Sequence, residues 1–259
     1  MAEPGASLFG LAIPAFTAVD RLMATTLAPL PRVILWGGLM AILSMLLYGL
    51  ISPQQKLAQL RSETAAARQK LAGFDGEMSA LWSLVGQSLK LSLRQILTIF
   101  VPAVIASLPL VSCLVWLDST FGYRSPSAGQ AVRVEVSPAS EIIQALPTSA
   151  LDQEVDGWEV HWPRSGSTIE LRDRQAAGLT VLGAPPGSDV VERRQWWNAL
   201  IGNPMGYLPE ASRIDRLEFD FKSLELHGIG PAWLRGWEAP FFLSLIVLSI
   251  LIKVLFRIE

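Results

Sequence analysis

Three long apolar runs constrain this chain more than any other feature of its sequence. They are Val33–Ile51, Ile96–Leu117 and Ala239–Phe256. Each is close to the ~20 residues that a helix needs to cross a bilayer. Because lipid offers the backbone no hydrogen-bond partners, only helices and closed barrels can cross it. Three isolated runs therefore predict three transmembrane helices, and Lys253, near the end of the third, is expected to snorkel to the interface.

The composition agrees with a membrane location. Of the 259 residues, 51% are hydrophobic and only 17% are charged, against about 25% charged residues in an average soluble domain. The net charge of −2 creates no field that would favour nucleic acid. The single cysteine, Cys113, excludes an internal disulfide and a cysteine metal cluster.

The positions of lysine and arginine near the runs predict the orientation. The loop between the first two runs holds six of them: Lys56, Arg61, Arg68, Lys70, Lys90 and Arg94. The N-terminal tail holds only Arg21 and Arg32. The positive-inside rule then places the N-terminus outside, the first loop in the cytoplasm, the second loop outside and the C-terminus in the cytoplasm. We expect a multi-pass protein of the cell inner membrane.

The segment before the first span, residues 1–32, is expected to lie on the outer face. Ser7–Leu30 is apolar but carries Asp20 and Arg21 and is interrupted by Pro14. This pattern predicts an interfacial amphipathic helix. A loosely ordered tail is the alternative.

Residues 52–94 predict a cytoplasmic helical hairpin. Ser52-Pro53 is a helix start signal, and Gly73 and Gly76 predict the turn. Apolar residues recur at spacings of three and four on both sides of that turn, as in a coiled coil. They are Leu57, Leu60, Thr64, Ala67 and Leu71 before it, and Met78, Leu81, Val85 and Leu89 after it, with Trp82 and Leu93 widening the second stripe. The hairpin is either a stiff connector or a docking arm for a partner such as a ribosome or a client segment.

Residues 118–238 predict one extracytoplasmic domain of α+β or mostly β type. Alternating apolar and polar residues at Ala131–Val136, Gly157–Trp162 and Thr168–Leu171 are typical of strands. Arg213–Leu226 alternates over most of its length, whereas Glu192–Ile201 is more helical. At ~120 residues the domain is long enough to have its own core.

The polar residues show no pattern of catalysis. His161 and His227 have no companions at metal-ligand spacing, so a surface or interface role is expected for both. The sequence contains no nucleophile elbow, Walker motif or dinucleotide fingerprint. We therefore predict no catalytic, cofactor-binding or metal-binding residues, no cofactor and no enzymatic activity.

Tryptophan-rich segments are the candidate partner surfaces. Trp196 and Trp197 follow two arginines, which suits lipid headgroups, a protein partner or a packed helix face. Trp233, Arg235 and Trp237 lead into the third span as a membrane anchor would. The hairpin contributes the other candidates: Leu57, Leu60, Leu71 and Trp82.

The order of these parts resembles the minimal core of the YidC/Oxa-type membrane protein insertases, including the archaeal members and the third subunit of the endoplasmic reticulum membrane complex. The resemblance rests on Val33–Ile51, Ser52-Pro53, the Lys56–Leu93 hairpin and the proline-containing span Ile96–Leu117. It is one of topology and covers about the first 120 residues and the last span. It implies a path for client segments beside hydroxyls and proline-freed backbone, and the candidates are Ser44, Pro102, Ser107, Pro109 and Ser112.

Two functions remain as hypotheses. The first is an insertase-like biogenesis or assembly factor that acts without covalent chemistry. The second is a structural or accessory subunit of a larger membrane complex, which grips its neighbours through the outer domain and the tryptophan-rich rim. Both imply the lipid bilayer and membrane proteins as partners, with ribosome contact through the hairpin as the one nucleic-acid exception.

Overall fold

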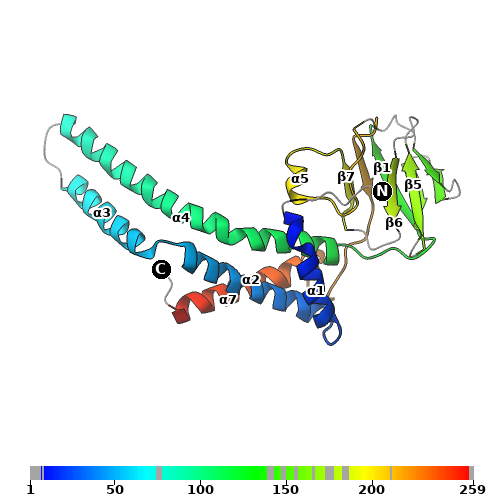
Figure 1. The fold of residues 1–259 in the computed structure, drawn as a ribbon, viewed down its shortest axis with the longest axis horizontal. Coiled ribbons are helices and arrows are strands. Elements are labelled where there is room, and N and C mark those ends of the chain that lie inside the picture. The colour runs from blue at the N-terminus through cyan, green and yellow to red at the C-terminus, as the bar shows by residue number, and fades with distance from the viewer. Residues whose placement is uncertain are drawn as a thin grey trace. The chain divides into compact units, whose positions relative to one another are not determined.

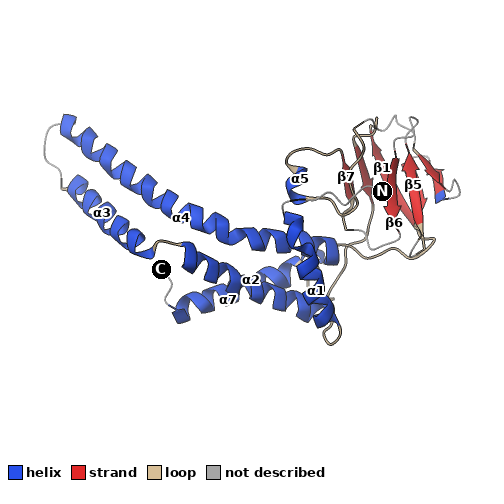
Figure 2. Ribbon diagram, viewed as in Figure 1, coloured by secondary structure: helices blue, strands red, loops and turns tan. Residues whose placement is uncertain are grey.

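The protein is mainly helical and carries a separate antiparallel sheet region (Figure 2). The computed structural model describes residues 7, 9–73, 78–138, 143–146, 150–154, 157–164, 167–172, 178–182, 187–210 and 212–256. Three of its helices are long and apolar enough to cross a membrane, over Pro29–Ile51, Leu81–Phe121 and Glu238–Leu255. The prediction of a helical membrane protein with a sheet-containing domain is confirmed at this level.

The helices are distributed along the chain as follows (Figure 1). They are the 3-10 helix η1 (Phe9–Ala12), α1 (Ile13–Ala24), α2 (Pro29–Ile51), α3 (Gln54–Ala72), α4 (Met78–Phe121), α5 (Asn198–Ile201), α6 (Ala232–Arg235) and α7 (Glu238–Phe256). The chain divides into two compact units. We call residues 1–37 with 111–244 the sheet unit and residues 38–110 with 245–259 the hairpin unit, and each is described by itself.

The hairpin unit contains α3 and most of α4, which run as two antiparallel arms (Figure 1). Residues 74–77, where the predicted turn falls, lie outside the described residues. The helix α4 continues through Pro102 and Pro109, which remove the amide partners of the Thr98 and Ile105 carbonyls. In the same unit α2 and α7 approach closely, because a Cβ on Gly38 would lie 2.8 Å from Leu248 Cδ1.

The sheet unit contains the eight strands found among the described residues. They are β1 (Ala131–Ser137), β2 (Gln144–Leu146), β3 (Leu151–Glu154), β4 (Gly157–His161), β5 (Thr168–Arg172), β6 (Gly178–Leu182), β7 (Val190–Glu192) and β8 (Arg216–Phe219). One sheet has the order β3-β4-β1-β8-β7 and the other β2-β5-β6, and every pairing is antiparallel. Alternate residues of β1 and β8 point into one core, where Val134, Leu217 and Phe219 are almost completely buried.

Two segments of this unit are shorter than their sequence patterns suggest. Of the alternating stretch Arg213–Leu226, only Arg216–Phe219 pairs as a strand. The Phe221 amide then donates to the Phe219 carbonyl at 2.9 Å, so the chain turns away while both phenyl rings stay stacked in the core. Within Glu192–Ile201, only Asn198–Ile201 is helical, because Glu192 belongs to β7 and Gly202 ends the helix at φ +84°.

Candidate functional site

The first arm of the hairpin buries one face. Leu57, Leu60 and Thr64 of α3 are buried, and Leu71 is half-buried. The Thr64 hydroxyl donates to the Leu60 carbonyl at 2.7 Å, so its polar atom is satisfied inside the helix. This apolar stripe is therefore used for packing inside the hairpin unit.

The second arm carries an apolar face that nothing in the described chain covers. Trp82, Leu89 and Leu93 of α4 are 70%, 68% and 55% exposed. Their spacings of seven and four place them on one side of the helix. We call these three residues the arm face. The half-buried positions of this arm include Leu84, Val85 and Leu91, so the arm also directs apolar side chains toward the rest of the unit.

The apolar part of α4 is longer than a bilayer can cover. The candidate span Leu81–Phe121 has 41 residues, about twice the ~20 that cross a membrane. The span predicted from the sequence, Ile96–Leu117, accounts for one bilayer thickness at the C-terminal half of α4. With that predicted span in the bilayer, the arm face precedes the membrane segment.

The candidate client-path residues have three different surroundings. Ser44 Oγ is buried and has no hydrogen-bond partner within the described part of the chain. The Ser107 hydroxyl donates to the Val104 carbonyl at 2.8 Å, so its polarity is satisfied locally. Pro102 is buried and Pro109 half-buried. Ser112 is buried too but belongs to the sheet unit, whereas the other four belong to the hairpin unit.

A buried ion pair links α1 to the start of α2, and the sequence reasoning missed it. The Asp20 carboxylate is buried and pairs with Arg32. Arg32 Nε donates to Asp20 Oδ1 at 3.0 Å, and Trp36 Nε1 donates to the same oxygen at 3.2 Å. The turn between Ala24 and Pro29 allows this pairing across twelve residues. The sequence showed Asp20 and Arg32 as isolated charges in an apolar region, but it did not show the turn that brings them together.

Aromatic rings enclose this ion pair in the sheet unit. The Trp36 and Trp116 ring centroids are 5.0 Å apart, and Phe16 lies 5.4 Å from Trp36. Trp116 Nε1 donates to Thr17 Oγ1 at 3.1 Å, and the Arg32 guanidinium lies 5.1 Å from the Phe121 ring centroid. The cluster ties α1 to the ends of both α2 and α4, so α1 is a packed element of the sheet unit.

The tryptophan-rich segments divide into exposed and buried residues. Trp196 is 81% and Trp233 73% exposed, while Trp197 is partly exposed. Trp237 is buried and packs edge-on against Phe241 at 6.1 Å. Arg235 donates to the Gly230 carbonyl at 2.9 Å and pairs with Glu225 at 3.4 Å. Trp196 and Trp233 are thus available to a partner or to lipid, whereas Trp237 and Arg235 hold the entry to α7.

Several ionisable groups of residues 118–238, which we call the sheet domain, form local pairs. His161 Nε2 lies 2.8 Å from Asp152 Oδ2, and this hydrogen bond raises the pKa of His161 above its ordinary value. Burial, followed by the hydrogen bond and charge of Asp189, raises the pKa of Tyr123. The Arg172 guanidinium lowers the pKa of Glu170. Among the described residues, no group of three His, Cys, Asp or Glu side chains could hold a metal ion.

Comparison with known proteins gives no relative. No family model, no curated protein and no solved structure matches this chain. The function is therefore inferred from the helices and exposed surfaces described above.

Proposed function

We propose that this protein is an insertase-like membrane-protein biogenesis or assembly factor that acts without covalent chemistry. The observation that carries the proposal is the arm face, because three large apolar side chains of α4 are exposed and precede the predicted span Ile96–Leu117. Such surfaces usually mark a place where another apolar segment binds. A client segment on its way into the bilayer has the matching chemistry.

The charge around the arm face suits the same role. Lys90 and Arg94 are exposed on α4, directly after Leu89 and Leu93. An apolar stripe beside lysine and arginine is typical of surfaces that bind amphipathic helices or membranes. We propose that α4 then leads the client toward Ser44 and the carbonyls freed by Pro102 and Pro109, where the membrane offers more polar groups than pure hydrocarbon.

We propose the orientation that the lysine and arginine distribution favours. The N-terminus and the sheet domain lie outside, and the hairpin and the C-terminus lie in the cytoplasm of a cell inner membrane. The arm face would then be presented to segments that have just been synthesised.

A reconstituted insertion assay tests this function. The full-length protein is placed in phospholipid vesicles, and a single-span client is synthesised in their presence. We expect the protein to increase protease-protected client, and we expect Trp82→Ser, Leu89→Ser and Leu93→Ser together to abolish the increase. A matched variant with three serines at the exposed positions Leu243, Ile246 and Ile250 of α7 removes a similar amount of apolar surface and serves as the control. Equal activity of the arm variant and the native chain would refute the proposal.

An accessory subunit is the second candidate. The low burial of the third span, α7, favours this function. Only 6% of the most apolar window of α7 is buried inside the chain, against 28% for α2 and 22% for α4. A helix so little covered by its own chain is free to pack against a neighbouring protein. Extraction in mild detergent distinguishes the candidates, because a subunit migrates in one complex of fixed stoichiometry whereas a biogenesis factor does not.

A further inference from the structure

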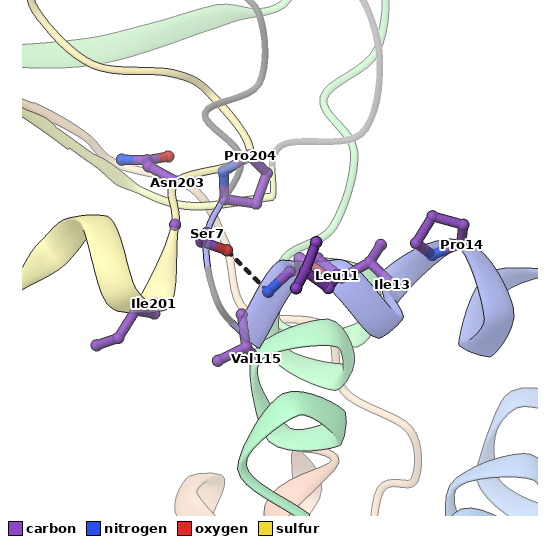
Figure 3. Close-up of a pocket in the computed structure, with 11 residues that line it drawn as sticks. Ser7, Leu11, Ile13, Pro14, Val115, Ile201, Asn203 and Pro204 are labelled. Atoms are coloured by element: carbon purple, nitrogen blue, oxygen red, sulfur yellow. Dashed lines mark hydrogen bonds between the residues drawn. The ribbon is translucent and has the colours of Figure 1, made fainter. Parts of the chain in front are cut away.

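A pocket of about 440 Å³ lies in the sheet unit, between three segments that are far apart in the sequence. The close-up shows Leu11, Ile13 and Pro14 on one wall, Val115 of α4 on a second, and Ile201 and Pro204 on a third (Figure 3). Its volume falls within the ~300–1,000 Å³ typical of small-molecule sites. A ligand can therefore fit without rearrangement of the fold.

The polar side chains of the lining are already engaged. Ser7 Oγ accepts a hydrogen bond from the Gly10 amide at 2.8 Å (Figure 3), and the Ser119 hydroxyl donates to the Trp116 carbonyl at 2.8 Å. Asn203 Nδ2 donates to the Val190 carbonyl at 2.7 Å, while its Oδ1 accepts from the Met205 amide. The remaining lining is mainly aliphatic, so the pocket suits an apolar ligand.

Close backbone approaches hold the walls in place. A Cβ on Gly187 would lie 2.4 Å from Pro204 Cβ and 3.5 Å from Ser119 Cβ. Gly187 therefore lies close to both the loop after α5 and the end of α4, and a side chain there would push them apart. Gly202 has a φ of +84° and donates to the Asn198 carbonyl at 2.8 Å, which ends α5 at the pocket. These contacts indicate a preformed cavity.

The pocket lies at the end of a candidate membrane span and next to exposed apolar side chains. Val115 and Ser119 are one turn apart near the end of the apolar helix α4. Leu11 and Ile201 line the pocket and are exposed, and Trp196 and Leu200, which precede Ile201 in the sequence, are exposed as well. Tryptophan beside aliphatic residues is typical of a membrane interface. Arg194, exposed just before these residues, adds a positive charge that suits a lipid phosphate.

We propose that this pocket binds one acyl chain of a bilayer phospholipid, with the exposed side chains of residues 196–201 in the interface above it. The continuity of the pocket with the end of a membrane span favours lipid over a second copy of this chain. The proposal does not depend on the insertase-like function.

Photolabelling tests the proposal with the full-length protein. The protein is reconstituted in vesicles of phosphatidylcholine and phosphatidylglycerol that contain a phosphatidylcholine with a diazirine at the end of one acyl chain. Chain ends of bulk lipid lie mainly at the centre of the bilayer. We expect adducts at residues 9–14, 115–119 and 201–204 that exceed those at other interfacial positions, because the pocket draws a chain end toward the interface.

Two variants of equal exposure provide the decisive comparison. Leu11 lines the pocket and Leu22 does not, and both are 74% exposed. Leu11→Asp should lower the pocket adducts by about tenfold, because a carboxylate against hydrocarbon is costly, whereas Leu22→Asp should leave them unchanged. Val115→Trp, which fills the cavity without adding charge, should lower them as well. Equal adducts in all variants, or pocket adducts no more frequent than those at other interfacial positions, would overturn the proposal.

Discussion

At the scale of single residues, the Asp20–Arg32 pair determines how the N-terminal segment is attached. Both side chains are largely buried, and Asp20 also accepts the Trp36 indole proton. Asp20→Ala would leave the Arg32 charge without its carboxylate in an aromatic surrounding. Loss of one partner of a buried pair costs about 3 kcal/mol or more.

We therefore expect Asp20→Ala to lower the midpoint of thermal unfolding in detergent by roughly 6–12 °C. The matched control is Asp152→Ala, which removes an exposed carboxylate from its partner His161 and should change the midpoint little. Similar shifts for both variants would show that the Asp20 pair does not stabilise the sheet unit.

The second residue-scale prediction concerns the titration of His161. Its hydrogen bond to Asp152 raises its pKa above 6.5, so the protonated form is favoured by the fold. The resulting stabilisation is present below pH 6.5 and is lost as pH rises through the folded-state pKa. The chain has two histidines, so histidine NMR signals can be assigned with His227→Gln. We expect the His161 signal to titrate at a higher pH than in Asp152→Asn, and an unchanged titration would contradict this.

The same residues show what sequence reasoning can reach. Lipid imposes apolar composition on a span, so α2, α4 and α7 are evident from hydropathy alone. Asp20 is visible in the sequence only as an interruption of an apolar stretch. Its pairing with Arg32 depends on the turn at residues 25–28. The spacing of apolar residues along the sequence does not determine the direction of such a turn. The hydrophobic stripe of α3 is evident from the sequence pattern. The exposure of Trp82 is not, because it depends on which face of α4 packs against the rest of the chain.

At the scale of elements, the two arms of the hairpin should respond differently to truncation. Leu60 of α3 is buried and Leu89 of α4 is 68% exposed. Leu60→Ala should destabilise the arm by about 2–5 kcal/mol, because it leaves a cavity, whereas Leu89→Ala should have little effect on stability. Hydrogen exchange of the α3 amides measures this difference. Faster exchange in both variants alike would show that α4 buries Leu89 as well.

The loop after α5 depends on one glycine conformation. Gly202 adopts φ +84° and ψ 160°, a region that residues with a Cβ rarely occupy. Gly202→Ala should therefore cost about 1–3 kcal/mol and loosen the wall of the pocket. Gly228→Ala, where a Cβ would meet nothing within 4 Å, is the control. Equal unfolding midpoints for the two variants would contradict the strain argument.

At the scale of the whole molecule, the orientation proposed above can be tested directly. Ser62 in α3 and Ser167 in the sheet domain are both exposed, and native Cys113 is buried. In spheroplasts, a membrane-impermeant maleimide should label Ser167→Cys at once and Ser62→Cys only after the membrane is permeabilised. The reverse pattern would show that the positive-inside rule fails for this chain, and the arm face would then lie outside the cytoplasm.

The insertase-like function proposed above requires the arm face to bind membrane-protein segments during their synthesis. The most direct measurement places a photoreactive phenylalanine derivative at Trp82 in living cells, with the exposed Gln69 of α3 as the control position. We predict adducts from Trp82 to many different newly made membrane proteins, which disappear when translation is stopped and do not form from Gln69. A single stable protein, captured at fixed stoichiometry whether or not translation continues, would contradict the claim and indicate an accessory subunit.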